Sequence, residues 1–238
     1  MNPLLGEFMG TLVLVLIGNG TVANVVLKKT LGNGSGWPVI ISGFGFGVMA
    51  AIFVAQACGS PGAHINPAVT LALAVSSGNF ADVPGFLVAQ LLGAFVGAIL
   101  VWLHFMPHWA ETEDAGGKLA CFSTGGAIPN TVSNFIGEAL GTMLLVIGVV
   151  SIVKGSGATP GLLQLLIGLL VWAIGAGLGG TTGFAINPAR DLGPRIAHAI
   201  LPIPGKGSSN FGYGLIVPVL GGFAGAVLAG LFLAAMGL

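Results

Sequence analysis

Long apolar runs separated by short polar segments dominate the pattern of hydrophobic and polar positions along this chain. A helix needs roughly 20 apolar residues to cross about 30 Å of hydrocarbon. Six runs reach that length, namely residues 3–27, 37–58, 84–106, 134–153, 161–180 and 212–236. The segments between them carry most of the charged residues and the turn-forming Gly, Pro and Asn. The pattern therefore predicts six transmembrane helices.

Two shorter apolar runs each contain a polar Asn-Pro pair near their start. They are "AHINPAVTLALAV" at residues 63–75 and "FAINPARDLGPRI" at residues 184–196. An asparagine side chain can accept a backbone N–H at a helix start, and proline suits the first helical position. We therefore expect Asn66 and Asn187 each to begin a helix of about 11 residues, which is about 16 Å long. Such a helix reaches halfway across a bilayer.

Three sequence matches show that the chain contains an internal repeat, in which its two halves resemble each other. Residues 6–15 match 137–146, residues 65–69 match 186–190, and residues 91–100 match 219–228, in the same order. The chain is therefore predicted to be one transmembrane domain, 1–238, with halves at about 1–106 and 131–238 joined by the loop 107–130. Because each half crosses the membrane an odd number of times, the second half enters from the opposite side. The predicted fold class is an all-α membrane protein with six transmembrane helices and two re-entrant half-helices in an inverted repeat.

Composition supports a protein that lies wholly in or beside the membrane. Hydrophobic residues make up 55% of the 238 positions and charged residues 6%, against about 25% charged residues in soluble domains. The formal net charge is zero and basic residues form no cluster, which argues against nucleic-acid binding. Cys58 and Cys121 have no metal-ligand spacing. We therefore expect no metal and no cofactor.

In an inverted repeat, the two half-helices should meet tip to tip at mid-membrane. Each helix N-terminus carries about half a positive charge, so the facing pair should repel cations and relayed protons while admitting neutral solutes. The asparagine amide groups can donate to a passing oxygen, and unpaired carbonyls of the preceding loops can accept from hydroxyl groups. Those loops comprise Gly62, Ala63, His64 and Ile65 before one helix and Gly183, Phe184, Ala185 and Ile186 before the other. This chemistry indicates a channel for small uncharged hydroxylic molecules.

The duplicated box carries a resemblance to a known family. Asn66-Pro67-Ala68 and Asn187-Pro188-Ala189, in two halves that each begin with Gly-Glu, resemble the aquaporin and aquaglyceroporin family over essentially the whole chain. The resemblance implies a passive channel without enzymatic activity, a homotetramer, a multi-pass place in the cell membrane and a cytoplasmic N-terminus. That orientation puts Lys154 alone among the basic residues on the inner side, against the positive-inside rule.

The resemblance also implies a narrow filter made by four residues. Carried over to this sequence they are Phe44, with Phe46 as the alternative, Gly175, Phe184 and Arg190. Water-selective members resemble a pattern with histidine at the position of Gly175, so glycine implies a wider pore. An aromatic wall opposite fixed N–H donors suits a polyol, which has carbon on one edge and hydroxyl groups on the other.

The glycerol-conducting branch is therefore the expected one, with glycerol, water and other small neutral solutes as partners. Asp191 also resembles that branch. Glycerol facilitators often have tryptophan at the position of Phe44, so the phenylalanine departs from their pattern. A water-dominated channel and an inverted-repeat secondary transporter are the alternatives.

Several ionisable residues have two readings. Glu7 and Glu138 lie within predicted spans, where carboxylates can carry protons; the resemblance implies instead that they accept hydrogen bonds from the loops that enter the half-helices. His64 can gate the pore by protonation or pack against its loop. His104 and His108 have the spacing of a helical metal pair, but Pro107 interrupts the helix and favours loop roles.

Overall fold

The computed structural model describes residues 2–238 and consists of helices and loops throughout that range. Six helical segments are long and apolar enough to span a membrane, which confirms the predicted number. The full spans are α1 (Pro3–Val26), α2 (Trp37–Ala57), α4 (Val83–His104), α7 (Thr131–Gly155), α8 with the short η1 (Leu162–Leu178 and Gly179–Thr181), and α10, η2 and α11 in sequence (Phe211–Gly214, Leu215–Gly221 and Gly222–Met236). The half-helices are α3 (Pro67–Ser77) and α9 (Pro188–Ile200), and the short α5 (His108–Glu111) and α6 (Ala115–Ala120) lie between the halves.

The second half-helix, α9, is longer than predicted because a lysine in the following loop caps its C-terminal end. Lys206 Nζ donates to the carbonyl oxygens of His198, Ala199 and Leu201 at distances of 2.6–2.8 Å. A cation at this end satisfies carbonyls that the helix itself leaves unpaired and interacts favourably with the helix dipole. The lysine lies in the loop after α9, so the periodicity of the helix gave no sign of it.

The last span contains a π-helical turn, η2, around Pro218. Proline has no backbone N–H and cannot make the usual α-helical bond, which explains a local change of hydrogen-bond pattern at this position. The corresponding position of the first half, by the repeat offset, is Gln90 in α4. The two halves therefore differ here, because the Gln90 side chain donates to the buried Glu7 carboxylate and proline has no side-chain donor.

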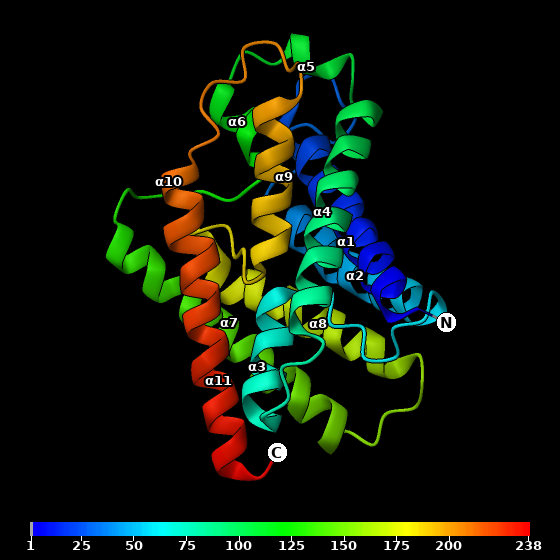
Figure 1. Cartoon of the computed structure of the whole chain (residues 1–238). Coiled ribbons are helices and arrows are strands. Elements are labelled where there is room, and N and C mark those ends of the chain that lie inside the picture. Colours follow the sequence, from blue (N-terminus) through cyan, green and yellow to red (C-terminus); the bar gives the residue numbers. More distant parts are fainter. Residues whose placement is uncertain (1) are drawn as a thin grey trace.

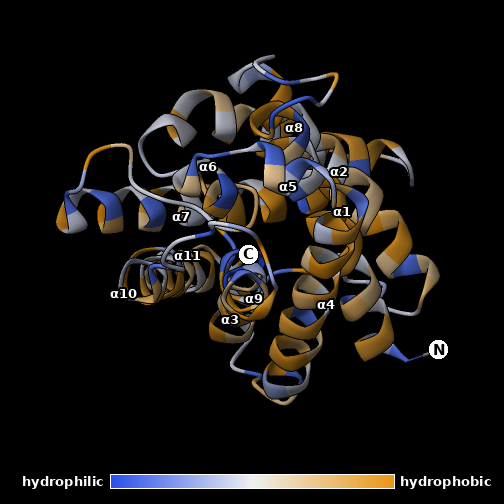
Figure 2. Ribbon diagram, turned by 90° about the horizontal axis from the view of Figure 1, so that it is seen from above, coloured by the Kyte–Doolittle hydropathy of each residue, from blue (hydrophilic) through white to orange (hydrophobic). Residues whose placement is uncertain are grey.

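Each half-helix packs against the third span of the other half. The main partner of α3 is α11, and the main partner of α9 is α4. Figure 1 shows α9 above α3 with α4 and α11 beside them, and Figure 2 shows the two half-helices superimposed between α4 and α11. The half-helices are therefore stacked end to end between the third spans of the two halves, as the inverted repeat predicts.

Glycines allow the spans within each half to approach closely. A Cβ added at Gly93 in α4 would overlap the Phe8 carbonyl oxygen of α1, and one added at Gly225 in α11 would overlap the Ala139 carbonyl oxygen of α7. The repeat pairs Gly225 with Gly97 of α4, where an added Cβ would lie 2.7 Å from the Leu12 carbonyl oxygen of α1. Small residues at helix crossings give van der Waals contact where lipid offers no hydrophobic driving force. Large apolar side chains remain exposed on the spans, and Figure 2 shows hydrophobic residues along most of the helix ribbons.

Gly225→Val is expected to destabilise the fold by about 2 kcal/mol, because the valine side chain would force α11 away from α7. The measurement is the free energy of unfolding by SDS titration in mixed micelles. Gly20→Ala is the matched control, since a Cβ at Gly20 in α1 meets no atom within 4 Å. Equal unfolding free energies for the two variants would contradict this account of the crossing.

Candidate functional site: a solute passage at the paired half-helices

The two asparagines begin the half-helices and cap them. Asn66 Oδ1 accepts the Ala68 N–H at 2.9 Å. Asn187 Oδ1 accepts the N–H groups of Ala189 and Arg190, each at 3.1 Å. Pro67 and Pro188 follow as the first helical residues, where a missing N–H costs nothing.

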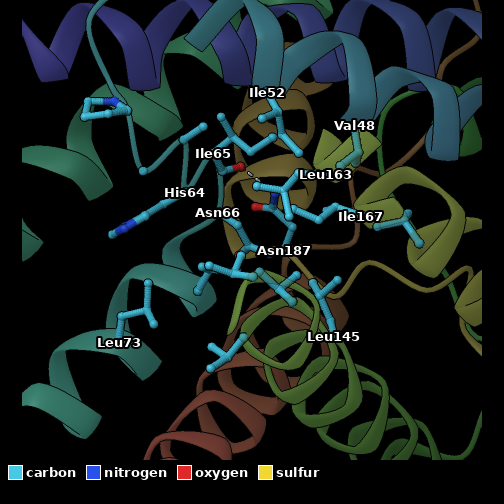
Figure 3. A pocket seen from close by; sticks show the side chains of 18 of the residues that line it. Val48, Ile52, His64, Ile65, Asn66, Leu73, Leu145, Leu163, Ile167 and Asn187 are labelled. Atoms are coloured by element: carbon cyan, nitrogen blue, oxygen red, sulfur yellow. Dashed lines mark hydrogen bonds between the residues drawn. The ribbon is translucent and has the colours of Figure 1, made fainter. Parts of the chain in front are cut away.

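Each asparagine also binds the loop of the opposite half. Asn66 Nδ2 donates to the Ile186 carbonyl at 2.8 Å, and Asn187 Nδ2 donates to the Ile65 carbonyl at 2.8 Å. Figure 3 shows the two side chains together, with a dashed line from Asn187 to Ile65. The expectation that these two carbonyls are unpaired is therefore wrong. One N–H of each amide is committed across the repeat, and the other stays available to a solute.

The loops that lead into the half-helices have an unusual backbone. Ala63 and Ile65 have φ values of 43° and 45°, and Phe184 and Ile186 have φ values of 39° and 42°. Such values are uncommon for residues other than glycine and are genuine outliers for isoleucine. Strain of this kind persists only where the surroundings hold the backbone in place. The buried glutamates provide that restraint.

Glu7 binds the first loop with both carboxylate oxygens. It accepts the N–H groups of His64 at 2.8 Å and Ile65 at 2.6 Å. Ser60 Oγ donates to it at 2.6 Å, and Gln90 Nε2 at 2.7 Å. A carboxylate that accepts four hydrogen bonds, two of them from loop N–H groups, is arranged to fix a loop. Sequence reasoning did not find Ser60 or Gln90.

Glu138 repeats this arrangement in the second half. It accepts the N–H groups of Ala185 at 3.0 Å and Ile186 at 2.8 Å, and Thr182 Oγ1 donates to it at 2.6 Å. Both glutamates are fully buried, so these charge-assisted bonds are the strong kind. Gly183 precedes the loop with a φ of 83°. The hydroxyl of Thr182 also escaped sequence reasoning, although a hydroxyl residue shortly before each box was a usable signal.

A cavity of about 520 Å³ leads from one face of the protein to the two asparagines. One wall is the loop backbone at Gly62, Ala63, His64 and Ile65. The opposite wall is apolar and includes Val48, Ile52, Leu145, Val149 and Ile167. Figure 3 shows Val48, Ile52, Leu145 and Ile167 around Asn66 and Asn187. The cavity is therefore polar along one side and hydrocarbon along the other.

Beyond the asparagines, the predicted filter residues lie together. The Phe44 and Phe184 rings meet edge to face with centroids 5.5 Å apart, and Arg190 Cζ lies 4.3 Å from the Phe44 centroid. Arg190 is buried, and its Nη1 has no hydrogen-bond partner within residues 2–238. Phe46, the alternative to Phe44, is 54% exposed on the outside of the bundle.

Gly175 completes this group and leaves room for the Phe184 ring. A Cβ added there would lie 3.0 Å from Phe184 Cζ and 2.9 Å from Ile41 Cγ2. Trp37 holds both residues, because its Nε1 donates to the Gly175 carbonyl at 3.2 Å and its ring meets Phe184 edge to face at 5.6 Å. Trp37 was missed because it lies two turns before Phe44, at the start of α2.

Asp191 anchors the outer loops to α9. Its carboxylate accepts the Thr124 N–H at 2.7 Å and the Thr124 hydroxyl at 2.8 Å, and it forms a buried ion pair with Arg195 at 2.8 Å. Arg195 in turn donates to the carbonyl oxygens of Thr124 and Ser209, each at 2.8 Å. These bonds fix two loops against the helix that carries Arg190.

The histidines considered from sequence lie apart from the solute path or at its wall. His64 Nδ1 lies 3.1 Å from Thr70 Oγ1, and in Figure 3 its ring turns away from the two asparagines. His108 Nδ1 lies 2.9 Å from the Lys28 carbonyl. Glu111 pairs with Lys29 at 2.5 Å. The His108 contact is with the loop after α1, whereas His104 is the last residue of α4, so its predicted place in a loop is wrong.

Comparison with known proteins supports the family resemblance seen in the sequence. The major intrinsic protein family model matches residues 1–233. Over 232 residues the chain is 51% identical to a probable glycerol uptake facilitator protein of Thermotoga maritima, covering 96% of this chain and 98% of that protein. It is 52% identical over 230 residues to the glycerol uptake facilitator protein of Streptococcus pneumoniae, with 96% and 97% covered. The X-ray structure of the aquaglyceroporin from Plasmodium falciparum matches with a TM-score of 0.83 at 29% identity, covering 97% of this chain and 94% of that one. The chain therefore belongs to the major intrinsic protein family.

Proposed function

We propose that this protein is a passive glycerol channel of the cell membrane that also conducts water and other small neutral solutes. The observation that carries the proposal is the buried Arg190 guanidinium, whose Nη1 is unpartnered among the described residues beside the Phe44 and Phe184 rings. An unpaired buried donor is costly unless a ligand or water binds it. The facilitator names of the relatives agree with this substrate class.

The geometry suits a molecule with two chemically different edges. At the filter, the rings of Phe44 and Phe184 receive the CH₂ edge, and the Arg190 donors receive hydroxyl oxygens. At mid-membrane, the free N–H of each asparagine amide receives the next oxygen. In the cavity, loop carbonyls from Gly62 to His64 accept hydroxyl hydrogens while the opposite wall stays apolar. A polyol thus exchanges its hydration for protein hydrogen bonds along the way.

Positive charge along the axis supports exclusion of cations and protons. The N-termini of α3 and α9 meet at the asparagines, and each contributes about half a positive charge. Arg190 adds a full charge one turn further along. A neutral solute passes this potential without cost, whereas a hydrated proton does not. The same arrangement gives Glu7 and Glu138 a structural task, with their oxygens occupied by loop donors.

We further propose a single channel domain over 1–238, a homotetramer in which each subunit has its own passage, and no catalytic activity. A passage lined by residues of one chain supports a separate path in each subunit, and the homotetramer rests on the family resemblance. The N-terminus is assigned to the cytoplasm. The cavity then opens to the cytoplasm, and the Arg190 filter lies near the outer surface.

Stopped-flow light scattering on proteoliposomes tests the proposal. In an inward glycerol gradient, vesicles with the protein should shrink and then reswell faster than protein-free vesicles. An enclosed pH dye should report no added proton leak. Rapid water flow without reswelling would favour a water-dominated channel instead. Saturable, ion-gradient-dependent glycerol entry would favour a coupled transporter.

A further inference from the structure

The two loops that enter the half-helices differ in length, and the difference lies at the cavity wall. Ser60 supplies the hydroxyl for Glu7 from six residues before Asn66, whereas Thr182 supplies the hydroxyl for Glu138 from five residues before Asn187. The first loop therefore contains one extra residue between its anchor and its box. Pro61 and Gly62 take up that length, and both are exposed and line the cavity.

The first loop is packed tightly against α1 at Ser60, the residue before Pro61. A Cβ added at Gly6 of α1 would lie 2.6 Å from the Ala55 carbonyl oxygen and would overlap the Ser60 backbone nitrogen. At Gly137, the equivalent position in the second half, the nearest atoms would lie 3.7 Å away. Ser60 is therefore fixed against α1, whereas Pro61 is exposed at the cavity.

Two glutamine side chains, Gln56 and Gln164, form a chain of hydrogen bonds that holds the Pro61 carbonyl. Gln56 Nε2 donates to the Pro61 carbonyl at 3.3 Å, and Gln164 Nε2 donates to Gln56 Oε1 at 2.7 Å. Gln164 is itself oriented by the Gly161 N–H, which donates to its Oε1 at 2.6 Å. Gln164 is buried at the start of α8, whereas Gln56 lines the cavity. The bonds thus connect the start of α8 to the wall of the passage.

We propose that Gln164 and Gln56 are positioning residues that hold Pro61 out of the solute path and so set the inner entrance for glycerol. This inference rests on the proposed function. Without the chain of bonds, the Pro61 carbonyl loses its partner and turns toward water in the cavity. Because Ser60 is fixed against α1 and Pro61 and Gly62 line the cavity, the released segment can enter the space through which solutes pass. A larger solute is hindered more than water.

The test compares glycerol and water permeabilities of proteoliposomes carrying Gln164→Met, Gln56→Met and the double variant. Methionine keeps the side-chain length and removes the amide. Each single variant should lower the ratio of glycerol to water permeability at least about threefold, the order expected when one fixing hydrogen bond is lost. The double variant should show no further loss, because both residues act through one segment. The matched control is Leu165→Met, since Leu165 lines a separate groove between α2 and α8.

The ratio of glycerol to water permeability distinguishes a change at the entrance from a loss of folded protein. Loss of folded protein lowers both permeabilities together and leaves their ratio unchanged. An unchanged ratio in Gln56→Met, whose side chain is partly exposed and dispensable for packing, would overturn the inference. So would losses that multiply in the double variant. Absence of glycerol flow in the wild-type protein would instead refute the proposed function.

Discussion

Gly175→His is expected to reduce glycerol permeability at least about tenfold and water permeability much less, because pore width and lining groups set selectivity. The added side chain begins 3.0 Å from Phe184 Cζ and 2.9 Å from Ile41 Cγ2. It must therefore displace the Phe184 ring or occupy the space beside Arg190. Either result removes the apolar wall that the carbon edge of glycerol needs, while a single water still fits.

The matched control for this change is Gly177→His, on the same helix. A Cβ at Gly177 meets no atom within 4 Å, and the residue is exposed. Stopped-flow rates for both solutes, normalised to the amount of reconstituted protein, give the comparison. Equal reductions of glycerol and water flow in Gly175→His would remove Gly175 from the filter.

Glu138→Gln is expected to lower the free energy of unfolding by about 3 kcal/mol, because it removes a charge-assisted bond and leaves a buried donor unpaired. Glutamine at this position can still accept from Thr182 and Ala185 through one oxygen. Its amide nitrogen would then face the Ile186 N–H, donor against donor. Ile186 has a φ of 42° and its carbonyl binds Asn66, so the pairing of the half-helices is disturbed as well.

The unfolding free energy of this variant is measured by SDS titration, together with glycerol permeability, which should fall with it. Glu111→Gln serves as the control, because that carboxylate pairs with Lys29 on the surface with side chains 44% and 70% exposed. A surface pair of this kind contributes at most about 1 kcal/mol. A Glu138→Gln protein as stable as the Glu111→Gln protein would show that the second loop needs no carboxylate.

The spans, the half-helices and their inverted order were predictable because each depends on local chemistry. Apolar length specifies a span, and an Asn-Pro pair specifies a helix start wherever it occurs. The match between residues 6–15 and 137–146 then relates the halves. These features can be predicted without knowing which side chains are in contact in the folded protein.

Contacts between distant segments were not predictable in the same way. The bonds from Asn66 to Ile186 and from Asn187 to Ile65 join residues more than a hundred positions apart. Trp37 and Gln90 act through groups on other helices, and no local pattern marks them. The filter group itself was placed by family resemblance, since aromatic residues and one arginine carry no spacing rule of their own.

The basic residues show why the positive-inside rule carries little weight for this chain. Lys118 donates to the Pro204 carbonyl, Lys206 caps α9, and Arg195 pairs with Asp191. These cations are engaged within the protein, so counting them as free loop charges overstates their influence on orientation. A rule that depends on loop charge applies poorly to a chain whose few charges are structural.

The exchange of partners between halves, α3 against α11 and α9 against α4, has a consequence for biogenesis. As the chain emerges from the ribosome, α3 is complete long before the segment that receives it is made. A half-length product therefore lacks both α11 and the loop that pairs with Asn66, so it cannot form the passage. The permeability barrier and the conduit are completed in the same late step, when the last helix inserts.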